Sequence, residues 1–169
     1  MDDKPQRDGL RIGYLATVVL PANTFFGGLL ITDRKSRPLE FRCTAPVQPN
    51  GTQVLLYGPT LQPYVLTELI GKTLVDQASI RPDVVLVDDA GMLPLREHVA
   101  APVGCLDAVA VEGPSRVGLH ALKWHAEFPK DEAAVEQLRQ RLPAEVDLLE
   151  PFERVRSALK EAVGAARAA

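Results

Sequence analysis

A predicted β-hairpin over residues 25–44 constrains the fold of this chain more than any other stretch. Leu39, Phe41 and Cys43 alternate with polar residues, and a period of two is typical of a strand with one face in the core and one in water. Residues 33–36, Asp-Arg-Lys-Ser, are typical of a turn. We therefore expect an antiparallel hairpin whose buried face carries these apolar side chains.

The patterns around the hairpin predict an α+β fold. A β-branched run at residues 10–20 precedes it, so the first strands are expected to pair as an antiparallel meander. Apolar residues at helical spacing predict a helix over residues 60–76, and the unbroken run at residues 84–87 predicts a central buried strand. With strands at 104–111 and 116–128, we expect a mainly antiparallel sheet of about five or six strands, with one helix packed on it and helices at the C-terminus.

Within residues 116–128 the apolar alternation changes phase between Ala121 and Leu122. A β-bulge would explain this change, as would a strand covered on both faces at its start. His120 and His125 fall on opposite faces of a regular strand. We therefore expect structural or surface histidines rather than a metal site.

The C-terminal region predicts helices with a narrow apolar stripe. Phe152, Val155, Leu159 and Val163 recur at helical spacing among charged residues, as in a coiled-coil seam. The stripe could dock on the chain's own sheet or on a second copy, and the hypothesis is a homodimer. The expected organisation is a mobile N-terminal arm (1–9), a sheet domain (10–128) and a helical segment (129–169).

Composition narrows the class of protein. Hydrophobic residues make up 46% and charged residues 24% of the chain, with a net charge of −3, which is typical of a globular protein. We find no cluster of Lys and Arg along the sequence, so a nucleic-acid partner is not expected. The chain lacks a signal-peptide pattern and an apolar run long enough to cross a membrane, which favours a cytoplasmic protein. Cys43 and Cys105 lie in apolar runs and are expected to be reduced core residues.

Asp88 and Asp89 form the most suggestive candidate site. They follow the predicted central strand, and ligands bind at the carboxyl ends of parallel strands. Paired carboxylates there can hold Mg²⁺, with water in the remaining positions. The alternative is structural, with Asp88 in a turn and Asp89 capping the short helix that follows.

The predicted order of elements resembles the layout of RNase H-like nucleases, and residues 81–91 look like the strand-Asp segment of that group. The resemblance implies metal-dependent phosphoryl transfer, with Mg or Mn held by Asp88 and Asp89 and with Asp107 as a further carboxylate. Those enzymes also place an acidic residue on the first strand. Residues 10–20 contain no carboxylate, and neither Asp33 at the hairpin tip nor Glu68 outside the helical stripe replaces it.

A well-patterned core without a convergent polar constellation favours a noncatalytic interaction or small-ligand-sensing module, a protein-binding domain that needs no cofactor. The alternative is the metal-dependent phosphoryl-transfer enzyme that uses Asp88 and Asp89. Whether the protein is an enzyme stays open at this level.

Overall fold

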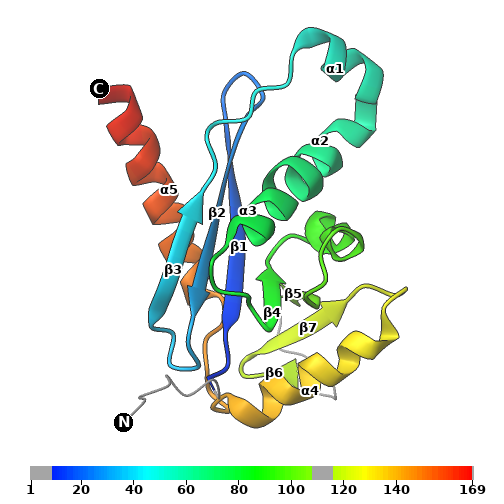
Figure 1. Cartoon of the computed structure of the whole chain (residues 1–169), viewed down its shortest axis with the longest axis vertical. Helices are drawn as coiled ribbons and strands as arrows, with labels where there is room; N and C mark the ends of the chain where they lie inside the picture. The colour runs from blue at the N-terminus through cyan, green and yellow to red at the C-terminus, as the bar shows by residue number, and fades with distance from the viewer. Residues whose placement is uncertain (1–8, 108–115, 169) are drawn as a thin grey trace.

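The computed structural model describes residues 9–107 and 116–168 of the chain, and the arm expected over residues 1–9 therefore lies almost entirely outside the described residues. The described residues form one seven-stranded sheet in the order β3-β2-β1-β4-β5-β7-β6 (Figure 1). The strands are β1 (Ile12–Leu20), β2 (Thr24–Thr32), β3 (Pro38–Cys43), β4 (Val84–Val87), β5 (Val103–Asp107), β6 (Arg116–Val117) and β7 (His120–Trp124). The helices are α1 (Gly51–Tyr57), η1 (Gly58–Thr60), α2 (Leu61–Tyr64), η2 (Val65–Lys72), α3 (Thr73–Gln77), η3 (Ala90–Glu97), η4 (Pro129–Asp131), α4 (Glu132–Arg141) and α5 (Glu150–Ala168).

The sheet confirms the α+β class and the predominance of antiparallel pairing. β1 pairs with β2, β2 with β3, β5 with β7 and β6 with β7 in antiparallel fashion, whereas β4 runs parallel to both β1 and β5. The parallel centre was not predicted. After β3, the helices from α1 to α3 form a crossover that brings the chain back beside β1. The next strand, β4, therefore runs in the same direction as β1.

Helices cover both faces of the sheet (Figure 1). One apolar cluster joins α2, η2, α3 and η3 to one face, and a second joins α4 and α5 to the other. Strand β1 feeds both clusters, since Tyr14 lies in the α5 cluster and Leu15 in the other. Its start is therefore buried on both faces, whereas Val19 near its end is 57% exposed.

The β2 strand receives side chains from both helical layers at two glycines. A Cβ at Gly27 would lie 2.1 Å from Ile70 Cγ2, and one at Gly28 would lie 3.0 Å from Val155 Cγ1 and from Leu159 Cδ2. These glycines therefore let the two layers pack closely against the sheet.

The predicted burial of the hairpin is wrong, although its strands and turn are confirmed. Leu39 and Phe41 are 45% and 40% exposed, and Cys43 is exposed as well. β3 is the edge strand, and its opposite face is the one that contacts the chain after α3, where Glu40 accepts the backbone N–H of Ser79. The expectation that both cysteines are core residues is therefore wrong for Cys43, whereas Cys105 is buried as expected.

The phase change near Ala121 is a tight hairpin and not a bulge. β6 and β7 pair antiparallel, with Val117 opposite His120. Gly118 makes the turn with φ +59°, a value that favours glycine, and a Cβ there would lie 2.5 Å from Val146 O. The part of the strand expected at residues 108–111 lies outside the described residues.

The apolar stripe of α5 packs on the chain's own sheet. Phe152, Val155 and Leu159 are each at most 1% exposed, and α5 contacts β1 and β2. The predicted homodimer through this stripe is unsupported, since one chain already covers it. None of the helices in the described part is long and apolar enough to span a membrane.

Candidate functional site

Asp88 lies at the carboxyl end of β4, the strand between β1 and β5. Its Oδ2 accepts a hydrogen bond from Arg156 Nη2 of α5 at 2.6 Å, and its side chain is 18% exposed. No donor among the described residues reaches its other oxygen, Oδ1. Asp88 is therefore a carboxylate held on one side by a guanidinium, with one oxygen available to a ligand.

Asp89 turns away from that arrangement. Its Oδ1 accepts the backbone N–H of Gly91 at 2.8 Å and caps η3. Asp107 ends β5, where its backbone pairs with Ala121, but its side chain lies outside the described part of the structure. The carboxylate of Glu68 lies 3.7 Å from His98 Nε2. The described side chains thus leave Asp88 as the only carboxylate shown beside Arg156.

A divalent metal at Asp88 fits as a single ion. Leu15 pairs with Val87, so Ala16 is the β1 residue next to Asp88, and it carries no ligand atom. β1 therefore lacks the acidic residue that a two-ion arrangement needs on the first strand. Mg²⁺ is nevertheless often held by one or two carboxylates, with water and substrate phosphates filling the remaining positions. The donor set at Asp88 matches that pattern.

One other group of side chains has metal-like spacing among the described residues. Candidate ligand atoms of Glu97, His125 and Glu127 lie within 4.8 Å of one another. However, His125 Nδ1 accepts the backbone N–H of Glu127 at 3.2 Å, so in a neutral ring Nε2 carries the proton and donates to Glu97 at 3.0 Å. Metal binding by a neutral ring through Nε2 would place the ring proton on Nδ1, opposite the N–H of Glu127, so the observed geometry favours a hydrogen-bonded cluster.

His120 supports the start of α5. Its Nε2 lies 3.1 Å from Asp147 Oδ1, which also accepts the backbone N–H of Leu149 at 2.9 Å. Burial acts to raise the pKa of Asp147, but the hydrogen bonds from Leu149 and His120 outweigh it and hold that pKa below its usual 3.8. This histidine is structural.

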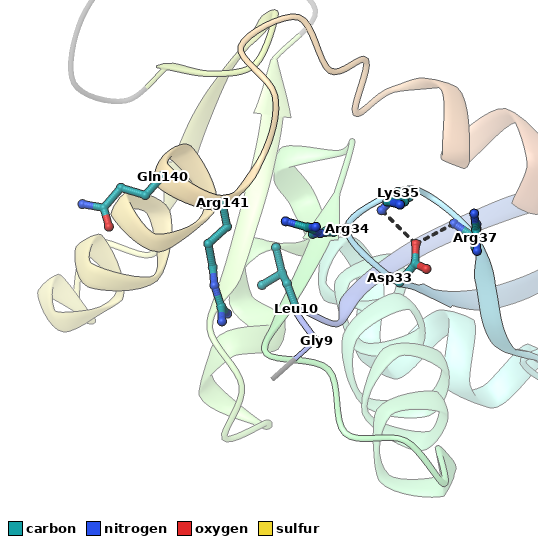
Figure 2. A pocket seen from close by; sticks show the side chains of 8 residues that line it. All are labelled: Gly9, Leu10, Asp33, Arg34, Lys35, Arg37, Gln140 and Arg141. Carbon is teal, nitrogen blue, oxygen red and sulfur yellow. Dashed lines mark hydrogen bonds between the residues drawn. The ribbon is translucent and has the colours of Figure 1, made fainter. Parts of the chain in front are cut away.

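A basic cavity of about 640 Å³ lies at the end of the parallel strands opposite to Asp88. The hairpin tip contributes Arg34, Lys35 and Arg37, and the end of α4 contributes Arg141. Figure 2 shows Arg34 and Arg141 reaching toward the same space from these two elements. The sequence interpretation found no basic cluster because Arg141 is distant in the chain. The run Arg-Lys-Ser-Arg at residues 34–37 was the available signal.

No protein family matches the chain, and no curated protein matches it. Among solved structures, endonuclease V of Ciona intestinalis, in complex with a 23mer DNA containing an inosine followed by a ribo-adenosine, is similar with a TM-score of 0.42 and 11% identity over 77% of this chain. This chain covers 57% of that endonuclease V chain. The catalytic domain of human endonuclease V has a TM-score of 0.41 and 13% identity, over 94% of this chain and 85% of that one. LC11-RNase H1, isolated from compost by a metagenomic approach, has a TM-score of 0.37 and 16% identity, over 93% and 97%.

These neighbours are nucleases. The main sequence expectation, a noncatalytic protein-binding or ligand-sensing module, is wrong on this finding, which favours the nuclease-like alternative. The Ciona protein is in complex with DNA, which conflicts with the expectation that nucleic acid is an unlikely partner. At TM-scores below 0.5, no residue role, substrate or reaction passes from these structures to this chain.

Proposed function

We propose that this protein is a nuclease-like phosphoryl-transfer enzyme that depends on a divalent metal, with Asp88 as the metal-binding carboxylate. The observation that carries the proposal is the position of Asp88 at the carboxyl end of β4, with Arg156 on one oxygen and the other oxygen free. This edge of a sheet with parallel strands is where ligands commonly bind. Asp107 ends β5, the strand next to β4, and the sequence interpretation named it as a further carboxylate.

The residues at this edge have distinct roles. Asp88 holds Mg²⁺ or Mn²⁺ through its free oxygen, and the ion, when bound, supplies charge stabilisation to a phosphoryl oxygen. Arg156 orients the Asp88 carboxylate through its hydrogen bond, and its planar guanidinium can bind a phosphate oxygen beside it. Asp89 acts as a positioning residue, because its cap fixes the first turn of η3 immediately after the site.

Hydrolysis of bis(p-nitrophenyl) phosphate tests this proposal without requiring recognition of a polymer. The intact protein should release p-nitrophenol with Mg²⁺ or Mn²⁺ and not with EDTA. Asp88→Asn should reduce that rate by at least about 100-fold, since it removes the charge that holds the ion. Asp107→Asn tests the second candidate ligand in the same assay.

The matched control is Asp76→Asn. It removes a carboxylate of α3 that pairs with Lys72 of η2, away from the carboxyl end of β4. It should retain the full rate. Arg156→Gln, which breaks the ion pair to Asp88 and removes the proposed phosphate contact, should also lower the rate, and thermal melts establish that each variant is folded. Metal-independent hydrolysis, or an Asp88→Asn protein as active as the Asp76→Asn protein, would contradict the proposal.

A further inference from the structure

The hairpin tip that lines the basic cavity is held by hydrogen bonds within a short turn. Asp33 N–H donates to Arg37 O and Ser36 N–H donates to Asp33 O, both at 3.0 Å. The Oδ1 atom of Asp33 accepts the backbone N–H groups of Lys35 at 2.8 Å and Arg37 at 3.0 Å. Arg154 of α5 donates to Ser36 O at 2.9 Å and ties the tip to the helix. The cations are therefore presented by a braced turn.

The cations of the cavity have no ion pair in the described part of the structure, where no carboxylate lies within ion-pair distance of the side chains of Arg34, Lys35, Arg37 or Arg141. Several other arginines are paired with acids: Arg42 with Glu40, Arg96 with Asp131, Arg139 with Glu136, Arg154 with Glu150 and Arg156 with Asp88.

Asp33 also lines the cavity, and its Oδ1 accepts two backbone N–H groups of the turn, so four cations and one carboxylate leave a net charge of +3 (4 − 1). Four cationic side chains around one cavity repel one another, and a bound anion relieves that repulsion.

We propose that this cavity binds the phosphate groups of a nucleic-acid backbone. The inference rests on the proposed function for the class of ligand and names nucleic acid as its substrate. Among the described lining residues, Leu10 is the only large apolar side chain and none is aromatic. Sites for drug-sized ligands are mostly apolar and aromatic, which this lining is not. Arginine and lysine side chains are the usual partners of backbone phosphates.

The cavity and Asp88 lie at opposite ends of the parallel strands. The hairpin tip follows Thr32, which pairs with Ile12 at the start of β1, whereas Asp88 follows Val87, which pairs with Leu15 further along β1. Substitutions in the cavity therefore leave the carboxyl end of β4 unchanged. The proposed phosphate-binding cavity and the proposed metal site can each fail without the other.

Fluorescence anisotropy with a labelled 24-nucleotide duplex, measured in EDTA over a series of salt concentrations, tests the binding of the backbone. The intact protein should bind the duplex with an affinity that falls steeply with salt. Arg34→Glu combined with Arg141→Glu should weaken binding at least about 10-fold and reduce the slope of log K against log salt by about 1.8, the value for two lost phosphate contacts.

The matched control is Lys130→Glu combined with Lys160→Glu, which changes the net charge by the same amount at two exposed positions outside the cavity. It should alter affinity less than about threefold, since distant surface charges are screened by salt. Equal losses in both double variants would overturn the inference, as would failure of the intact protein to bind the duplex. Competition by a mononucleotide as effective as that by the duplex, at equal phosphate concentration, would assign the cavity to a small phosphate ligand and overturn the nucleic-acid assignment. Because binding is measured in EDTA, its outcome is independent of the metal-dependent hydrolysis that tests the site at Asp88, so failure of one proposal is distinguishable from failure of the other.

Discussion

Glu40 and Phe41 are neighbours on β3 that lie in opposite environments. The Glu40 carboxylate accepts the backbone N–H groups of Ser79 and Ile80, and its side chain is 14% exposed. Phe41 is 40% exposed on the other face of the strand. The charged residue therefore contributes more to stability here than the aromatic one, the reverse of what alternation alone predicts.

We expect Glu40→Ala to lower the free energy of unfolding by about 1.5–3 kcal/mol, because it leaves two backbone donors without their charged acceptor. Phe41→Ala should cost about 1 kcal/mol or less. Burial acts to raise the pKa of Glu40, but the bonds from Ser79, Ile80 and Arg42 outweigh it and hold that pKa below its usual 4.5. Its contribution should therefore be complete above the pKa of the unfolded state and disappear as the pH falls through the lower folded pKa.

Denaturant melts of Glu40→Ala and Phe41→Ala between pH 3 and pH 7 check this expectation. The difference in free energy of unfolding between the intact protein and Glu40→Ala should shrink as the pH falls. A larger loss of unfolding free energy for Phe41→Ala than for Glu40→Ala at pH 7 would contradict this expectation. It would indicate that the face of β3 that carries Phe41 is the buried one.

At the scale of elements, the glycines of β2 set the distance between sheet and helices. Gly27→Ala should destabilise the protein by about 1–3 kcal/mol, because the new Cβ overlaps the fully buried Ile70 side chain. Gly164→Ala is the matched control at an exposed position of α5, where nothing lies within 4 Å of the new Cβ, and it should stabilise the protein slightly. Thermal melts of the two variants compare these effects, and a Gly27→Ala protein as stable as the intact one would show that β2 and η2 are not in close contact.

The sequence predicts elements with strong local patterns, and the structure confirms them. The run at residues 84–87 is the buried β4, and the helical stripe with Leu61, Val65 and Ile70 faces the sheet. Neighbours in space decide the rest. Alternation on β3 could not show which face the chain after α3 would cover, and the two-residue β6 was too short to separate from β7 by period alone.

At the scale of the whole molecule, charge distribution matters more than net charge. The chain carries a net charge of −3, from which a nucleic-acid partner was not expected. The fold nevertheless gathers four cations at the amino end of β1 and leaves Asp88 at the carboxyl end of β4. The first strand remains the chief departure from the RNase H-like layout, since Ala16 lies where an acid would face Asp88.

The central claim is that Asp88 binds a divalent cation, and a crystal structure of the intact protein soaked in Mn²⁺ tests it most directly. We expect an anomalous peak at about 2.0–2.3 Å from Asp88 Oδ1, with water in the remaining coordination positions. The peak should be absent from Asp88→Asn crystals soaked in the same way. A peak confined to the cluster of Glu97, His125 and Glu127, or no peak near Asp88 in the intact protein, would contradict the claim.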